Sequence, residues 1–285
     1  MRRSALQSLL LLLLSATLAS CGSNSLKDGP PRSGSASIPE LPDDAVPRRE
    51  PRSKYGNGPV YEVLGQRYTV MRSSDGYKER GVASWYGKKF HGNLTSNREP
   101  YDMYAMTAAH KSLPLPTYVR VRNLRNNRTV VVRVNDRGPF AHNRIIDLSY
   151  SAALKLDMVK DGTSLVEVEA ISFDSPAGDR PTRQPTAAPP PRPAPRPEPA
   201  TAGASMNDNR IFVQVGAFGS RENAEQRLRR LRSSGIGISF ILEDGASEPA
   251  IYRVRIGPIK GVVQYDIIVE ELENLGITDP YLVTE

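Results

Sequence analysis

Four side chains suited to acid–base chemistry lie within residues 81–147 of this sequence. Glu99 and Asp102 stand close together in REPYD. Asp136 stands in VNDRGPF, and His110 stands in MTAAHKSLP. Paired carboxylates are what glycoside cleavage requires, because one protonates the leaving oxygen and the other stabilises positive charge at the sugar. A histidine beside them could orient a carboxylate or accept a sugar hydroxyl. These residues predict a carbohydrate-active site.

Each of these residues also has a structural interpretation, and both interpretations stay open at this point. Asp136 precedes Arg-Gly-Pro, where an acidic residue is an ordinary turn former, and it could pair with Arg137. Glu99 and Asp102 could be solvated loop acids. His110 could be a core histidine whose ring nitrogens have partners within the protein.

Trp85 and Tyr86 lie in GVASWYG, just before a polar loop. A flat aromatic face can cover the C–H surface of a pyranose ring, so both residues are predicted to bind substrate. Packing in the core of the domain is the alternative.

A zinc site has to be considered because the chain contains three histidines, His91, His110 and His142. With Asp136 they could be the zinc ligands of a zinc-dependent wall peptidase or amidase. Their spacing matches no HExxH or CxxC signature, and the chain contains no GxSxG motif. The sequence therefore predicts neither a metal nor another cofactor.

The elements around these residues are short and strand-rich. Residues 61–70 (YEVLGQRYTV) predict a hairpin that turns at Gly65-Gln66, and GVASWYG predicts a strand that ends at Gly87. Residues 118–124 and 129–136 alternate apolar and charged side chains, which predicts a second hairpin. Its turn is expected at the two asparagines 126–127, since Asn tolerates positive φ.

Two further strands, RIIDL and LVEVEAI, follow the second hairpin, and Ser149 is expected to cap a brief helix between them. Many short strands, few helices and close turn signals predict a small β-barrel, bounded at 59–172.

The N-terminus predicts export. Residues 1–20 contain two arginines and a leucine run too short to span a bilayer comfortably, as in a signal peptide. LASC then resembles the bacterial lipobox, so Cys21, the only cysteine, is the predicted lipidation site. Gly22 follows it instead of the Asp that retains related lipoproteins at the inner membrane. We therefore expect an outer-membrane lipid anchor facing the periplasm. Residues 21–58 lack an apolar pattern and predict a disordered tether.

Residues 173–206 are rich in Pro and predict an extended disordered linker. Residues 207–285 predict a separate domain with the element order βαββαβ, a ferredoxin-like split βαβ arrangement. Ser220 is expected to cap its first helix, and Gly276 to end its second. The expected fold class is thus mainly β plus α+β.

The net charge of +7 comes largely from Arg in the Pro-rich segments. No element interleaves this charge with aromatic residues, so nucleic acid is not an expected partner. An anionic cell-surface polymer or lipid headgroups fit the charge equally well.

The residues quoted above, together with FHGNLTSNREPYDMYAMTAAHKSLPLPTYVRVRNL and VVRVNDRGPF…RIIDLSYSAA, resemble the rare lipoprotein A family of septal lytic transglycosylases. The resemblance implies a double-psi β-barrel. FVQVGAF and YRVRIGP resemble a SPOR domain, which implies binding of peptidoglycan glycan strands that lack stem peptides. Proteins of the division site are candidate partners.

The resemblance also implies site residues. Asp136 would be the catalytic acid, with Glu99, Asp102 and His110 as its supporting polar set. The reaction would cleave the β-1,4 bond between N-acetylmuramic acid and N-acetylglucosamine and leave a 1,6-anhydro end. In the C-terminal domain, four residues would bind glycan: Gln214, Phe218, Tyr252 and Arg253. A non-catalytic glycan-binding or wall-loosening protein is the alternative.

Overall fold

The computed structural model describes residues 28–31, 41–173, 210–244 and 249–285. The predicted signal peptide, the lipidation site Cys21 and nearly all of the predicted linker lie outside these residues. Among the described residues, no helix combines the length and the apolar character needed to cross a membrane.

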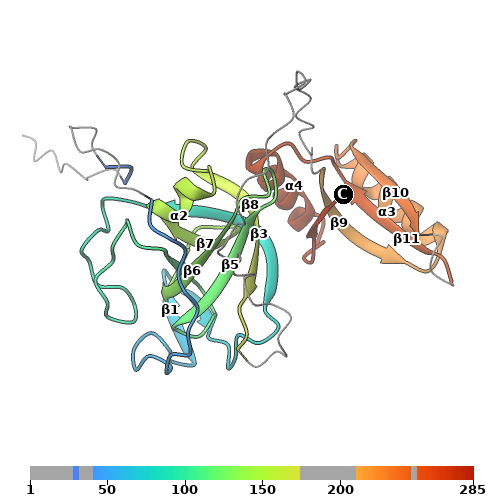
Figure 1. Ribbon diagram of the computed structural model, residues 1–285. Helices are drawn as coiled ribbons and strands as arrows, with labels where there is room; N and C mark the ends of the chain where they lie inside the picture. The colour runs from blue at the N-terminus through green and yellow to red at the C-terminus, as the bar shows by residue number, and fades with distance from the viewer. Residues whose placement is uncertain (1–27, 32–40, 174–209, 245–248) are drawn as a thin grey trace, which may run out of the picture.

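Six strands close into a barrel, as predicted (Figure 1). Around the barrel the strands follow the order β3-β7-β4-β6-β5-β8. The pairs β3·β7 and β4·β6 are parallel, and the others are antiparallel. The strands are β3 (Lys78–Tyr86), β4 (Thr107–His110), β5 (Thr117–Asn123), β6 (Thr129–Asp136), β7 (Arg144–Ser149) and β8 (Thr163–Ala170).

The barrel closes because alternate side chains of its strands are apolar. Val130, Val132 and Val134 of β6 are fully buried and pack with valines of β5 and β8 in one core. The predicted turn between β5 and β6 is confirmed, with Asn127 at φ 58°. Ser149 caps helix α2 (Tyr150–Lys155) as predicted, because its Oγ accepts a hydrogen bond from the Ala152 N–H.

The first hairpin lies outside the barrel and consists of β1 (Val60–Val63) and β2 (Gln66–Thr69). Its turn is at Leu64-Gly65, so the predicted turn at Gly65-Gln66 is wrong by one residue. Both turn residues have positive φ, 52° and 76°, as a two-residue hairpin loop of type I′ requires.

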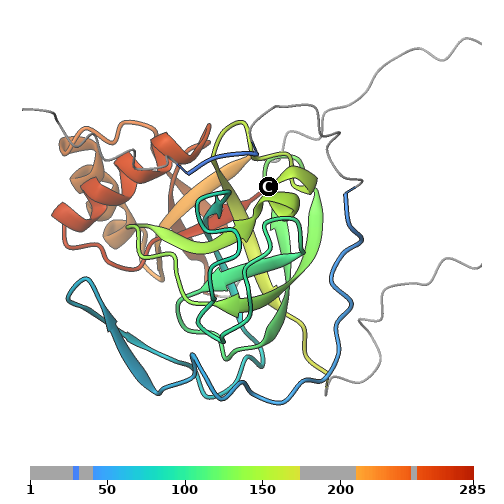
Figure 2. The same ribbon diagram turned by 90° about the vertical axis from the view of Figure 1, so that its left-hand side faces the viewer.

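Residues 41–58 do not form the free tether that was predicted. Figure 2 shows this blue segment running along the outside of the barrel. Asp44 accepts a hydrogen bond from the Val131 N–H at 2.9 Å and pairs with Lys155. Glu50 pairs with Arg133 at 2.8 Å. The segment is held by ion pairs and backbone bonds, and these interactions replace the apolar pattern that it lacks.

The C-terminal domain has the predicted order βαββαβ. Its strands form one sheet in the order β10-β11-β9-β12, with every neighbouring pair antiparallel. Its helices pack on one face of that sheet. The elements are β9 (Ile211–Phe218), α3 (Arg221–Ser233), β10 (Ser239–Asp244), β11 (Ile251–Ile256), α4 (Val262–Asn274) and β12 (Tyr281–Thr284).

The helix boundaries of this domain agree with two of the predicted positions. Ser220 is at the N-cap of α3, although its side chain makes no capping hydrogen bond. Gly276 follows α4 with φ 69°, the left-handed conformation that commonly ends a helix.

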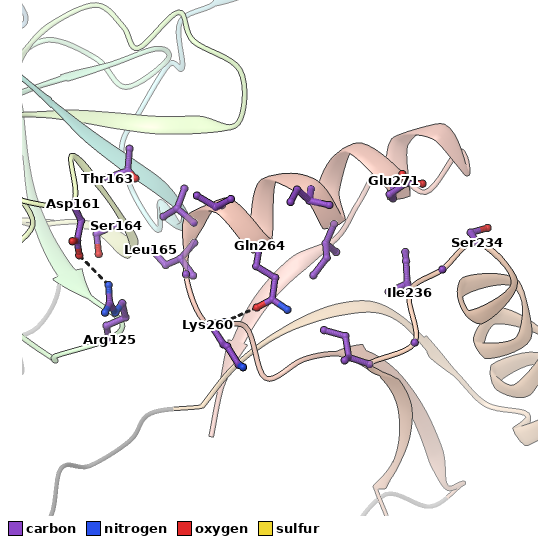
Figure 3. A pocket seen from close by; sticks show the side chains of 18 residues that line it. Arg125, Asp161, Thr163, Ser164, Leu165, Ser234, Ile236, Lys260, Gln264 and Glu271 are labelled. Carbon is purple, nitrogen blue, oxygen red and sulfur yellow. Dashed lines mark hydrogen bonds and ion pairs between the residues drawn. The ribbon is translucent and has the colours of Figure 1, made fainter.

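The two domains touch through the outer side of β3 and β8. Arg80 donates a hydrogen bond to the carbonyl of Leu282 at 3.2 Å, and Leu165 joins the apolar cluster of the C-terminal domain. A cleft of about 1200 Å³ lies between residues of the two domains. In Figure 3, Thr163 and Leu165 of the barrel line it opposite Gln264 of α4. None of the predicted catalytic residues lines this cleft.

Candidate functional site

Two aspartates occupy one row across adjacent strands of the barrel. Asp136 of β6 pairs with Ala109 of β4, and Ala109 pairs on its other side with Asp147 of β7. Asp147 in turn pairs with Ser84 of β3. A register shift precedes the Ala109–Asp136 pair, so Asp136 follows an irregularity at the end of β6. Strands lie about 4.8 Å apart, so the Cα atoms of the two aspartates, two strands apart, are about 10 Å from each other. Ala109 is the residue of β4 between them.

The row lies on the outside of the barrel. Ala108 and Leu148, which alternate with Ala109 and Asp147 along their strands, are fully buried in the barrel core. Ala109 instead belongs to a second cluster, which also contains aromatic residues of the polar loop 87–106. The loop therefore covers this part of the outer surface and forms one wall of the site.

Asp136 is firmly positioned as a hydrogen-bond acceptor. Its Oδ1 receives the Ser96 N–H at 2.7 Å, the Ser96 hydroxyl at 2.6 Å and the Arg137 N–H at 2.7 Å. Each of these donors belongs to a loop, so Asp136 ties the polar loop to the end of β6. Asp136 therefore organises the turn that follows β6, and it also lines a pocket.

The pocket beside Asp136 has a volume of about 490 Å³ and combines aromatic, cationic and polar walls. Tyr61 and Phe140 meet edge to face at 6.3 Å between ring centroids, and the Arg137 guanidinium lies 5.8 Å from the Tyr61 ring. Aromatic faces beside a few polar groups suit a sugar ring. The pocket is lined by Gly56, Gly58, Tyr61, Val63, Leu94, Thr95, Ser96, Arg98, Asp136, Arg137 and Phe140.

Asp147 is the titratable residue that sequence reasoning missed. Burial raises its pKa, and this outweighs the hydrogen bond from the Ser84 hydroxyl and the charges of Arg144 and Lys111, which lower it. A carboxyl group with a raised pKa keeps its proton to higher pH than an ordinary carboxyl group does, which suits a proton donor. The available signal was the acid inside the apolar strand RIIDL, which places a carboxylate on a barrel strand.

The charges of both aspartates act on Tyr86. Burial raises the pKa of its hydroxyl, and the charges of Tyr101, Asp136 and Asp147 add to the effect. Within the described part of the chain, this hydroxyl has no hydrogen-bond partner. The Tyr86 ring stacks on Tyr101 at 4.0 Å and is only 8% exposed. Its ring face is therefore covered and its hydroxyl is buried, so Tyr86 does not present a stacking surface to a sugar.

Trp85, the other predicted stacking residue, packs against Tyr150 with 5.6 Å between ring centroids. It also contacts both apolar clusters of the barrel domain. It does not line the pocket beside Asp136.

Glu99 makes a two-pronged ion pair with Arg133. Its carboxylate oxygens lie 2.7 and 3.0 Å from the guanidinium nitrogens, and Asn135 donates to it at 2.9 Å. Burial works to raise its pKa, but these hydrogen bonds outweigh burial and lower it. Glu99 is therefore a fixed anion that holds the polar loop against β6, and it is a poor proton donor.

Asp102 and His110 lie outside the row and outside the pocket. Asp102 is exposed, accepts the Tyr104 N–H at 2.9 Å and lies 3.6 Å from His91 Nδ1. In the described part of the chain, no group of three or more His, Cys, Asp and Glu side chains is arranged to hold a metal ion.

His110 is buried and anchors the loop that follows β4. Its Nδ1 accepts the N–H groups of Ser112 and Leu113 at 3.2 and 3.0 Å, and its Nε2 lies 2.7 Å from the Tyr77 hydroxyl. Burial and the charges of Arg137 and Lys111 lower its pKa to about 3. Because Nδ1 accepts two hydrogen bonds, we assign the proton to Nε2. This geometry fits a core histidine better than a catalytic base.

The four residues predicted to bind glycan in the C-terminal domain divide between the two faces of the sheet. Gln214 and Arg253 alternate with core residues and lie on the face without helices. Gln214 is nearly fully buried and accepts a hydrogen bond from Arg255 at 3.2 Å, while Arg253 pairs with Asp244 at 2.9 Å. Phe218 and Tyr252 are cross-strand partners that pack on the helix side.

Comparison with known proteins agrees with this architecture. Residues 78–168 match the family described as lytic transglycolase, and residues 207–284 match the SPOR domain. The endolytic peptidoglycan transglycosylase RlpA of Vibrio cholerae is 47% identical over 64% of this chain and 68% of that protein. RlpA of Pseudomonas aeruginosa is 36% identical over 84% of this chain and 80% of that protein.

Among solved structures, the Streptomyces papain inhibitor (SPI) is 22% identical over 34% of this chain and 96% of that chain, with a TM-score of 0.29, and this likeness carries no argument. The coverage and identity of the relatives, together with both matching domains, show that this chain belongs to the RlpA family of peptidoglycan transglycosylases.

Proposed function

We propose that this enzyme cleaves the β-1,4 bond between N-acetylmuramic acid and N-acetylglucosamine and forms a 1,6-anhydro end. The observation that carries the proposal is the row of Asp136, Ala109 and Asp147 on the outside of the barrel. It brings two carboxyl groups of one barrel together, and burial raises the pKa of one of them, Asp147. A carboxyl group with a raised pKa suits the transfer of a proton.

In this proposal Asp147 donates its proton to the glycosidic oxygen, and the bond between that oxygen and C1 of the muramoyl residue breaks. The C6 hydroxyl of the same residue then attacks C1, and its proton returns to Asp147. No water is consumed and the proton balance is zero. The family resemblance implied the acid role for Asp136, but the three donors on its Oδ1 suit a group that accepts hydrogen bonds. Asp136 would therefore position the sugar and stabilise positive charge at C1.

The proposed site of action is the division septum. A SPOR domain that binds peptide-free glycan would bring the barrel to strands of that kind. A lipid on Cys21 would hold the protein at the outer membrane facing the periplasm. Radiolabelled palmitate incorporation in wild type and Cys21→Ser tests the anchor, and fluorescence imaging of a fusion protein tests the septal position.

Mass spectrometry of soluble products from peptide-free glycan tests the reaction. We expect anhydro-ended fragments from the wild type and none from Asp147→Asn. Asp161→Asn, on the exposed surface near α2, serves as the matched control. Products with reducing ends would show hydrolysis. Retention on glycan without any product would show a binding protein.

The pH profile identifies the proton donor. Because the Ser84 hydroxyl lowers the pKa of Asp147, Ser84→Ala should raise it further. The activity requires protonated Asp147, so the alkaline limb of kcat/KM should move to higher pH in this variant. An unchanged limb would mean that another group donates the proton.

A further inference from the structure

A carboxylate from the N-terminal segment is bound at the loop that follows β3. Asp28 accepts the Gly87 N–H with both carboxylate oxygens at 3.1 Å, and the Lys89 N–H with Oδ1 at 3.2 Å. The carbonyl of Gly29 accepts the Lys88 N–H at 3.0 Å. Three consecutive backbone N–H groups of one loop therefore bind residues 28–29, part of the short blue segment of Figure 2.

The loop is shaped for a close approach at this point. A Cβ atom on Gly87 would lie 2.3 Å from the Gly29 carbonyl oxygen and 2.9 Å from the Trp85 ring. Any side chain at this position would displace the bound segment. Lys88 and Lys89 are exposed and add positive charge around the bound carboxylate. The loop thus combines backbone donors and positive charge, which is a suitable environment for an anion.

This carboxylate site borders the row of aspartates. Ser84 of β3 pairs with Asp147, and Gly87 lies three residues further along the chain, about 10 Å at the rise of a strand. The charge of Asp28 adds to the burial that raises the pKa of Asp147. A ligand whose glycosidic bond lies at the row could therefore place a nearby carboxylate at Gly87.

We propose that the N–H groups of Gly87 and Lys89 form a subsite for the lactyl carboxylate of a peptide-free muramoyl residue, and that Asp28 occupies it when substrate is absent. The proposal rests on the function proposed above. In intact peptidoglycan the stem peptide converts this carboxylate into a neutral amide. Removal of the peptide restores the anion, which accepts stronger hydrogen bonds than an amide carbonyl does. The barrel itself would then select peptide-free strands, independently of the C-terminal domain.

Asp28 acts in this scheme as a competitor attached to the same chain. The apparent dissociation constant of a ligand rises by the inverse of the fraction of free sites. A segment that occupies its site about 80–90% of the time would weaken substrate binding about five- to tenfold. Removal of the Asp28 charge should therefore strengthen the binding of a carboxylate ligand by about the same five- to tenfold, and should not change the binding of a ligand without a carboxylate.

Hydrogen–deuterium exchange of the loop 86–91 in the full-length protein in detergent micelles gives a local readout that does not require cleavage. The probes are peptide-free glycan strands and the same strands with their muramoyl carboxyls converted to methylamides. Asp28→Asn removes the charge, and Asp43→Asn makes the same change elsewhere on the N-terminal segment. Without glycan, the loop should exchange faster in Asp28→Asn than in the wild type or in Asp43→Asn.

Free-carboxylate glycan should restore protection in Asp28→Asn at about five- to tenfold lower concentration than it needs to displace Asp28 from the wild type. The methylamide glycan should not restore it. Equal protection by both glycans would overturn the carboxylate subsite, and unchanged exchange in Asp28→Asn would overturn the role of Asp28. The reaction is tested separately by its products, so a missing anhydro end refutes the proposed function whatever the exchange data show.

Discussion

Substitution of Glu50 by Gln should destabilise the barrel, although the sequence placed this residue in a disordered tether. Arg133 donates to Glu50 through Nε at 3.0 Å and Nη2 at 2.8 Å, and Tyr118 donates its hydroxyl at 2.5 Å. The same guanidinium binds Glu99, whose side chain positions the polar loop. Glu50 therefore helps to position the polar loop through Arg133 and Glu99.

The expected loss follows from these contacts. Hydrogen bonds to charged groups contribute about 1.5–3 kcal/mol each, but the pair is partly solvated and Gln keeps one acceptor. We expect a loss of about 1–2 kcal/mol at pH 7, or about 4–8 °C in Tm for a domain of this size. The hydrogen bonds from Arg133 lower the pKa of Glu50 from 4.5 to about 2. The stabilisation is therefore complete above about pH 4.5 and is lost as the pH falls towards 2.

Thermal unfolding followed by tryptophan fluorescence measures this effect in the barrel alone, because Trp85 is the single tryptophan of the chain. Glu62→Gln, an exposed glutamate of β1, is the control and should leave Tm unchanged. A Glu50→Gln barrel as stable as the wild type at pH 7 would refute the structural role of the segment. A difference that persists undiminished at pH 2 would refute its electrostatic origin.

Three further outcomes are expected. His110→Ala should cost about 2–4 kcal/mol in urea unfolding, because two buried N–H groups lose their acceptor, and the activity profile between pH 5 and 8 should keep its shape because His110 is neutral throughout. Ser96→Ala removes one of the donors to Asp136 and should lower kcat about tenfold. Its free energy of unfolding should stay within about 1 kcal/mol of the wild-type value. In pull-down on peptide-free glycan, Arg253→Ala should weaken retention more than Tyr252→Phe, because Arg253 lies on the face of the C-terminal sheet without helices. The reverse order would place the binding surface on the helix side.

The strands of the barrel could be predicted where their side chains alternate. Residues 129–136 read as a strand because valines recur at every second position, and the structure buries those valines. Strand β4 has the sequence TAAH, which is short and carries no alternation, so nothing marked it as a strand. Its importance is topological, because it lies between β6 and β7 and brings Asp136 and Asp147 into one row.

The order of residues 41–58 escaped prediction for a different reason. Sequence reasoning linked order to an apolar pattern, and this segment has none. Its contacts are between charged residues far apart in the chain, such as Glu50 and Arg133, which are separated by 83 positions. Whether a charged residue meets such a partner depends on the closed barrel, and local composition does not contain that information.

The roles of the acidic residues also depend on contacts that form only in the folded barrel. Glu99 and Asp147 are both partly buried carboxylates, yet their pKa values move in opposite directions. Glu99 meets a guanidinium that makes two hydrogen bonds with it, whereas the hydrogen bond to Asp147 comes from the neutral Ser84 hydroxyl. The guanidinium lowers the pKa of Glu99, whereas burial dominates at Asp147 and raises its pKa. REPYD and RIIDL contain these two carboxylates, but the groups that meet each of them in the folded barrel decide the direction of its pKa shift.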